Sequence, residues 1–140
     1  MSISTVRSEF ALRGNEVLDV LEGEYALISL LPNTEITLPS TGALRVLIED
    51  PFETTLILEV TAWQKIAARY PEAKANGHYR AIRLSQDFPL ETVGVMAKLT
   101  SALAQAGVSI MAYSTFKTDV VLVREWELSK AVGALWDLRF

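Results

Sequence analysis

The fold is decided by one stretch of the sequence, residues 93–136, which reads VGVMAKLTSALAQAGVSIMAYSTFKTDVVLVREWELSKAVGALW. Apolar residues recur at every third or fourth position over residues 90–106, and this spacing is typical of a helix. The helix is expected to start near Glu91 and to bury one stripe of side chains, made of Val93, Met96, Leu99, Leu103 and Ala106. Gly107 follows and suits the C-terminal cap of the helix.

Short apolar runs surround this helix and predict strands. Residues 79–84 precede it, residues 108–113 follow it, and residues 120–123 form a continuous aliphatic run after a turn at 114–118. A last helix is expected to place five residues on one face: Leu128, Ala131, Val132, Leu135 and Trp136. The resulting order of strand, helix, strand, strand, helix matches most of a ferredoxin-like split βαβ unit, whose antiparallel sheet buries one face under two helices.

The first half of the chain repeats part of this order. Strands are predicted at 25–31, 43–48 and 54–60, and the last two form a hairpin. Thr61 is expected to cap a helix that buries Trp63 and ends at Pro71, and Asn76-Gly77 is expected to turn the chain. A weak internal repeat supports duplication, because a Thr-led aliphatic strand precedes a tryptophan at both Trp63 and Trp126.

We therefore predict an α+β protein of two ferredoxin-like βαββαβ lobes, residues 1–77 and 78–140, with antiparallel sheets and helices packed on one face. The second lobe lacks one strand, because the sequence ends at Phe140 directly after the last helix. An N-terminal segment, either Ile3–Leu12 or Val17–Leu21, is expected to complete the sheet of the second lobe and so to interleave the two lobes.

Composition removes most catalytic chemistries. Half of the 140 residues are hydrophobic, there is no cysteine, and His78 is the single histidine. Zinc fingers, iron–sulfur clusters, cysteine proteases and disulfide scaffolds are excluded on this ground. Phosphate-binding and dinucleotide-binding glycine motifs are also missing from the sequence. We expect a protein that is not an enzyme and that needs no cofactor and no metal.

Charge and hydropathy limit the partners. The net charge is −4 at pH 7, and neither half of the sequence forms the basic cluster that phosphate backbones or anionic lipids require. The N-terminal residues have no apolar run of signal-peptide length, and no later stretch reaches the length of a membrane span. The sequence therefore predicts a cytoplasmic protein that binds neither nucleic acid nor membrane.

Four segments of the second half resemble the ACT domain family: Gly94-Val95-Met96-Ala97, Ala106-Gly107-Val108-Ser109-Ile110, Ser114-Thr115-Phe116-Lys117-Thr118-Asp119 and Leu122-Val123-Arg124-Glu125. More narrowly, they resemble small bacterial tandem-ACT proteins related to the cytosolic arginine sensors of animals. The resemblance covers roughly residues 80–137 well and the N-terminal half by element order alone. It implies a non-catalytic regulatory module that binds a small metabolite, usually an amino acid, between two ACT units. A homodimer and a regulated partner protein are further expectations.

The same resemblance implies a set of ligand-binding residues. They lie in the loop before the first helix, at the end of the following strand and just after the turn: Asp87, Phe88, Thr92, Val93, Gly94, Tyr113, Ser114, Thr115 and Asp119. Physical reasoning supports part of this set, because unpaired N–H groups at a helix start attract a carboxylate. Gly94 lets a ligand approach the backbone closely, and Asp119 offers an acceptor for an ammonium or guanidinium group.

Two alternatives stay open. Asp119, Ser114 and Thr115 are also typical turn formers that bond local amides. A structural or dimerisation module that binds no ligand would use the same sheet edges and helices. An acid–base pair among Asp87, Glu91 and Asp119 ranks below both readings, because no nucleophile accompanies it.

Overall fold

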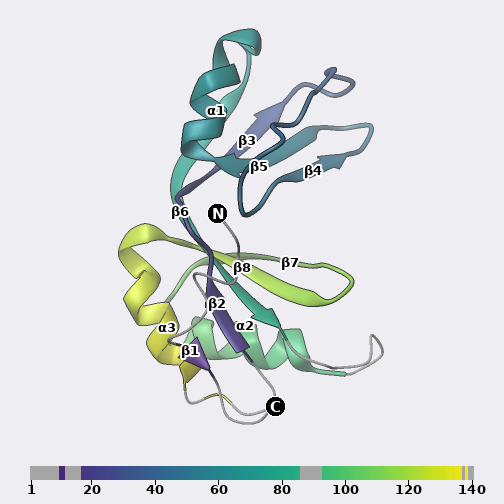
Figure 1. Ribbon diagram of the computed structural model, residues 1–140. Helices are drawn as coiled ribbons and strands as arrows, with labels where there is room; N and C mark the ends of the chain where they lie inside the picture. The colour runs from purple at the N-terminus through teal and green to yellow at the C-terminus, as the bar shows by residue number, and fades with distance from the viewer. Residues whose placement is uncertain (1–9, 12–16, 86–92, 137, 139–140) are drawn as a thin grey trace. The chain divides into compact units, whose positions relative to one another are not determined.

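The structure, a computed structural model, describes residues 10–11, 17–85, 93–136 and 138. The chain divides into two compact units. Unit 1 is Gly23–Tyr79, and unit 2 joins Ser2–Glu22 to Arg80–Phe140. Strand β6, Lys74–Ser85, begins in unit 1 and ends in unit 2 (Figure 1). Unit 2 therefore combines a segment from the beginning of the chain with the whole C-terminal half.

Unit 2 is a sheet with two helices. Its elements are β1 (Phe10–Ala11), β2 (Val17–Val20), the end of β6, α2 (Val95–Gln105), β7 (Ile110–Ser114), β8 (Thr118–Arg124), a 3-10 turn at Glu125–Glu127 and α3 (Leu128–Trp136). The strand order is β1-β2-β6-β8-β7. Strand β2 pairs antiparallel with β6, and β7 pairs antiparallel with β8. The order β2-β6-β8-β7 is that of a four-stranded ferredoxin-like sheet.

Strand β2 supplies the strand that residues 78–140 lack. Its pairing runs from Val17 opposite Ser85 to Val20 opposite Ile82. Of the two segments that the sequence left open, it is therefore the second, Val17–Leu21, that lies against β6. Leu18, on the face of β2 that is covered by the helices, is fully buried. The division at residues 77 and 78 stays a prediction.

The core of unit 2 lies between the sheet and both helices. Alternate residues of β2, β6 and β8 point to one face and pack with α2 and α3 in a single cluster, whose buried members are Leu18, Ile82, Leu84, Leu99, Leu103, Val108, Val121, Val123, Ala131 and Leu135. The residues between them, among them Asp19 and Arg83, point to the opposite face because side chains alternate along a strand. This alternation positions the polar groups described below.

The first predicted helix is shorter than expected. Helix α2 begins at Val95, and Gly94 before it has a φ of 88° in the left-handed region. A residue in that conformation interrupts the helical backbone, so the helix does not extend from Val95 to residues 93–94 as expected. The expected start near Glu91 lies outside the described residues. Leu99 and Leu103 are buried as predicted. Val93 is 94% exposed, so its place in the buried stripe was wrong.

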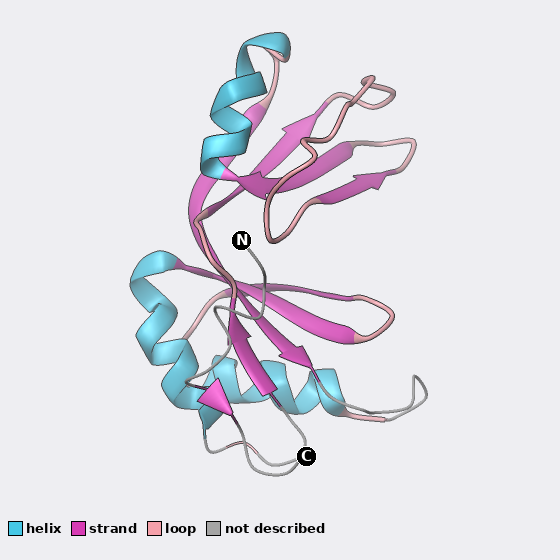
Figure 2. Cartoon of the chain, in the orientation of Figure 1, coloured by secondary structure: helices cyan, strands magenta, loops and turns pink. Residues whose placement is uncertain are grey.

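Unit 1 repeats the strand order of unit 2. Its elements are β3 (Tyr25–Leu30), β4 (Val46–Glu49), β5 (Thr54–Glu59), α1 (Val60–Ile66), a 3-10 turn at Ala67–Arg69 and the start of β6. The order is β6-β3-β5-β4, and each neighbouring pair is antiparallel. A chain segment without regular structure stands where unit 2 has α2 (Figure 2). The buried residues Trp63 and Ile66 of α1 pack on this sheet.

Two predicted details of unit 1 are wrong. Thr61 does not cap α1, because the helix begins at Val60 and the N–H of Val60 donates to the carbonyl oxygen of Glu24 at 2.8 Å. Asn76-Gly77 does not turn the chain but lies inside β6. The register shifts there, since Tyr25 pairs with Tyr79 but Leu27 pairs with Asn76. A β-bulge therefore absorbs the extra residues, and His78 takes a φ of 68° within it.

The predicted fold class is confirmed as an α+β protein with antiparallel strands and helices. In unit 2, α2 and α3 pack on the same face of the sheet, as expected. Within the described ranges, no helix combines the length and the apolar character that crossing a membrane requires.

Candidate functional site

The turn between β7 and β8 brings three of the expected site residues together. Ser114 pairs with Asp119 in the strand register, and its hydroxyl donates to Oδ1 of Asp119 at 2.6 Å. The N–H of Thr115 donates to the carbonyl oxygen of Thr118 at 2.8 Å, and the N–H of Thr118 donates to the hydroxyl of Thr115 at 3.0 Å. These bonds support the turn-forming role of all three residues. The side chains of Ser114 and Thr115 stay exposed.

The start of α2 holds two further expected residues, Val93 and Gly94. Gly94 stands at the N-cap and has no side chain, and within the described part of the chain no side-chain cap bond is made at the start of α2. A Cβ on Gly94 would meet no atom within 4 Å, so the space beside its backbone is open. The first turn of α2 is therefore accessible to a small anionic group. Both this turn and the β7–β8 hairpin lie on the right of unit 2 in Figure 1.

The other expected residues divide into two sets. Asp87, Phe88 and Thr92 lie outside the described residues. Tyr113 is described, and it pairs with Val120 on the sheet face opposite to the helices, because Val121 and Val123 of β8 face the core cluster. The hydroxyl of Tyr113 is buried and has no hydrogen-bond partner among the described residues.

Burial changes the acidity of Tyr113. Desolvation raises the pKa of its hydroxyl, and the positive charge of Arg83 opposes this by a smaller amount, so that the resulting pKa is about 12. Tyr113 therefore keeps its proton, and remains a hydrogen-bond donor, far above neutral pH.

Arg83 is fixed by a buried carboxylate that the sequence analysis did not select. Its Nη2 lies 2.9 Å from Oδ2 of Asp19, and the Asp19 side chain is 0% exposed. The Nε of Arg83 is buried and has no partner among the described residues. A partial signal was present in the sequence, because Asp19 is the lone charge within the apolar run Val17–Leu21. Its partnership with Arg83 needed the pairing of β2 with β6.

The raised pKa of Tyr113 predicts a loss of stability in alkali. The pKa of Tyr113 is higher in the folded state, about 12, than in the unfolded state, about 10, so the protonated hydroxyl stabilises the fold. This stabilisation is complete below about pH 10 and is lost as the pH rises from about 10 to about 12. We expect a slope shallower than about 1.4 kcal/mol per pH unit, because Tyr113 is only partly buried.

The measurement is urea unfolding of the wild type and of Tyr113→Phe across this pH range. The variant should lose stability less steeply than the wild type, because phenylalanine has no proton to release. Equal slopes in the two proteins would show that Tyr113 is not the group responsible.

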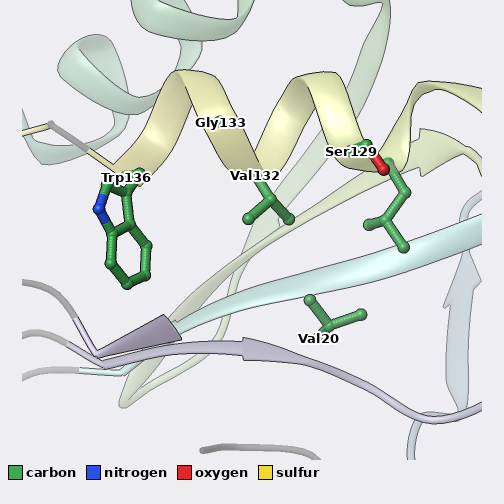
Figure 3. A pocket seen from close by; sticks show the side chains of 6 residues that line it. Val20, Ser129, Val132, Gly133 and Trp136 are labelled. Atoms are coloured by element: carbon green, nitrogen blue, oxygen red, sulfur yellow. The ribbon is translucent and has the colours of Figure 1, made fainter. Parts of the chain in front are cut away.

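A groove also runs along α3 in unit 2. It has a volume of about 440 Å³ and is lined by Val20, Leu128, Ser129, Val132, Gly133 and Trp136. Val132 and Trp136 point from the helix toward β2, where Val20 faces them (Figure 3). The groove is mostly apolar, and none of the expected ligand-binding residues lines it.

Gly133 keeps part of this groove open. Glycine inside a helix is about 1 kcal/mol less favourable than alanine, and a Cβ on Gly133 would meet no atom within 4 Å. We expect Gly133→Ala to raise the free energy of unfolding by up to about 1 kcal/mol in urea denaturation.

Gly107→Ala is the matched control. Its Cβ would also meet nothing, but Gly107 has a φ of 75°, so alanine there should destabilise the protein. A loss of stability in Gly133→Ala would contradict the account of an open helix face.

Comparison with protein families identifies the segment that carries these features. The ACT domain family matches residues 74–137, which include β6, α2, the β7–β8 hairpin and α3. This segment is an ACT domain. A search of curated proteins found no match to the chain. Strand β2 stands before the matched segment, yet it pairs with the first strand of the ACT domain.

Solved structures share the fold over more than the ACT domain itself. A protein of Agobacterium tumefaciens is 22% identical, with a TM-score of 0.68 and 84% of both chains covered. The ligand-free regulatory subunit of aspartate kinase from Thermus thermophilus is 15% identical, with a TM-score of 0.54, and 87% of this chain and 95% of that chain are covered.

Aspartate kinase from Clostridium acetobutylicum is 14% identical, with a TM-score of 0.69; 92% of this chain is covered, but only 35% of the kinase. This chain therefore corresponds to about a third of that enzyme. At these identities the likeness concerns the fold alone, and it extends across most of both units.

Proposed function

We propose that this chain is a non-catalytic regulatory protein that binds an amino acid through its ACT domain. The observation that carries the proposal is the uncapped start of α2, with Gly94 and open space beside it, within the segment that the ACT family matches. The fold is shared, over 87% of this chain, with a protein that is itself a regulatory subunit, that of aspartate kinase. A regulatory role for this chain agrees with both findings.

The ligand is held at both of its ends in this proposal. Its carboxylate accepts hydrogen bonds from the first-turn N–H groups of α2, next to Val93 and Gly94, where the helix dipole favours negative charge. Its ammonium donates to Asp119. A carboxylate has about four lone-pair sites, so Asp119 can bond Ser114 and a ligand at once. Asp87, Phe88, Thr92, Tyr113 and Thr115 complete the proposed contact set.

The two units are two ACT-type lobes in this proposal. Their strand orders, β6-β3-β5-β4 and β2-β6-β8-β7, place corresponding strands at corresponding positions. Ligand binding between ACT units, and assembly as a cytoplasmic homodimer that acts on a regulated protein, follow from the family resemblance. Gel filtration tests the dimer, which should elute at about twice the mass of the 15.5 kDa chain.

A structural or dimerisation module without a ligand is the second candidate. The bond between Ser114 and Asp119 favours it, because each side chain already has a partner within the turn. The two candidates differ in what an added amino acid does to stability.

The test is a thermal-shift screen against each of the twenty amino acids. A ligand at one hundred times its dissociation constant adds about 2.7 kcal/mol to the free energy of unfolding, which raises the melting temperature by several degrees. Asp119→Ala should abolish the shift and leave the melting temperature without ligand almost unchanged. If none of the amino acids shifts the wild type, the ligand-binding proposal fails and the dimerisation module is favoured.

Asp50→Ala provides the matched control. Asp50 is a turn aspartate of the β4–β5 hairpin, and its Oδ1 accepts the N–H groups of Phe52 and Glu53 at 2.7 and 2.9 Å. This variant should lose stability but keep the ligand-induced shift. An Asp119→Ala variant that behaved in the same way would reduce Asp119 to a turn residue.

A further inference from the structure

Two buried donors that have no acceptor among the described residues lie on the face of the unit 2 sheet that is turned away from α2 and α3. They are the Nε–H of Arg83 and the hydroxyl of Tyr113. Arg83 pairs in register with Asp19, one position along from the core pair of Leu18 and Leu84. Because side chains alternate along strands, Arg83 and Tyr113 share the face opposite to the core cluster.

The two donors come from strands that are separated by one strand of the sheet, β8. Arg83 stands near the end of β6 and Tyr113 near the end of β7. The charge of Arg83 also acts on the Tyr113 hydroxyl. Native proteins pair almost all of their buried polar groups, so two unpaired donors on one face of this short stretch of sheet indicate that an acceptor comes from outside the chain. A ligand oxygen placed between them would pair both.

We propose that Arg83 Nε and the Tyr113 hydroxyl form a second binding site of the ACT domain, one that takes the carboxylate of a small monocarboxylic acid. A guanidinium presents several N–H donors in a planar fork that matches a carboxylate, and Arg83 uses Nη2 to bond Asp19. Asp19 holds the fork in place, and Arg83 then bridges two carboxylates. The Arg83 side chain is 19% exposed, which leaves a route for a small acid.

The site differs from the amino acid site proposed above. It uses the side chains of Arg83 in β6 and Tyr113 in β7 on one face of the sheet, whereas the amino acid site centres on the first turn of α2 and the hairpin turn and shares only Tyr113 with it. Neither proposal depends on the other, because no amino acid is needed to occupy the second site.

The test is an NMR titration of the intact chain, labelled with carbon-13 at Cζ of its four tyrosines. Sodium acetate is the probe, and sodium chloride at equal ionic strength is the reference. The Tyr113 resonance, assigned from its loss in Tyr113→Phe, should shift and saturate with acetate but not with chloride. A Tyr113 resonance that does not saturate, or that responds equally to chloride, would overturn the proposal and leave a buried water as the acceptor.

Two variants sharpen the test. Arg83→Lys keeps a positive charge beside Asp19 but removes Nε–H, and it should weaken acetate binding about tenfold. Tyr70→Phe is the control, because the Tyr70 hydroxyl lies in unit 1 and donates to the carbonyl oxygen of Glu35 at 3.5 Å. It should leave acetate binding unchanged. Wild-type affinity in Arg83→Lys would also overturn the proposal.

Stability gives an independent readout. Tyr113→Phe removes a hydroxyl that has no partner in the part of the chain that the structure describes, so its melting temperature without acetate should be no lower than that of the wild type. A clear decrease would show that the hydroxyl is already bonded within the protein, and this result too would contradict the proposed site.

Discussion

Leu18→Ala is expected to lower the free energy of unfolding by about 3 kcal/mol, because it removes a fully buried side chain and leaves a cavity. Leu18 comes from β2, yet it packs in the core cluster with Leu84 of β6 and Leu103 of α2. A residue near the start of the sequence therefore supports the unit that contains the ACT domain. Urea denaturation of the intact chain measures the effect.

Leu31→Ala is the matched control for this prediction. Leu31 is 58% exposed and follows β3 in unit 1, so the same change of side chain should cost less than about 0.5 kcal/mol. Equal losses in the two variants would mean that β2 does not hold Leu18 in the core of unit 2.

Asp19→Asn is expected to destabilise the protein by about 3 kcal/mol, since it removes the charge that compensates Arg83. Breaking a buried ion pair from one side leaves the other charge without its partner in a poorly solvated place. Asp19 is fully buried, whereas the Arg83 side chain is 19% exposed, so the effect should fall at the lower end of the range for buried pairs. Thermal and urea unfolding of the variant measure it.

A surface ion pair provides the comparison for Asp19→Asn. Lys130 lies 3.2 Å from Glu127 at the start of α3, and its side chain is 55% exposed. Lys130→Gln should cost less than about 1 kcal/mol, because water screens and replaces the lost partner. If Asp19→Asn cost no more than Lys130→Gln, Arg83 would have to reach solvent on losing Asp19.

The parts of the fold that depend on local pattern were predictable from the sequence. The apolar stripe with Leu99 and Leu103 predicted α2, and Gly107 predicted its end. The N–H of Gly107 donates to the carbonyl oxygen of Ala104, and the N–H of Val108 donates to that of Leu103. These features arise within a few residues of one another. The helix start was missed because the apolar spacing continued past Gly94, whose left-handed backbone is not visible in a periodicity.

Other features depend on contacts between distant parts of the chain. The bulge at Gly77 and His78 fits the opposite strand β3, so Asn76-Gly77 looked like a turn when considered alone. Asp19 and Arg83 are 64 residues apart, and only the pairing of β2 with β6 brings them together. For the same reason, the sequence identified the turn residues Ser114 and Asp119 but not the buried pair.

The two tryptophans that the weak sequence repeat aligns lie in different environments. Trp63 is buried and stacks on Tyr70 with ring centroids 6.1 Å apart. Trp126, its counterpart in the repeat, is 71% exposed and lies under the guanidinium of Arg124 at 5.7 Å. Strand order can thus be shared by two units while individual positions take different environments.

The central claim is that an amino acid binds at the start of α2 and the β7–β8 turn. Amide chemical shifts of the nitrogen-15-labelled chain, recorded during titration with the amino acid that gives the largest thermal shift, test it most directly. The account predicts saturable changes at Gly94, Val95 and Met96 and at Ser114 and Asp119. Changes confined to the α3 groove around Val132 and Trp136, or no saturable change with any amino acid, would contradict it.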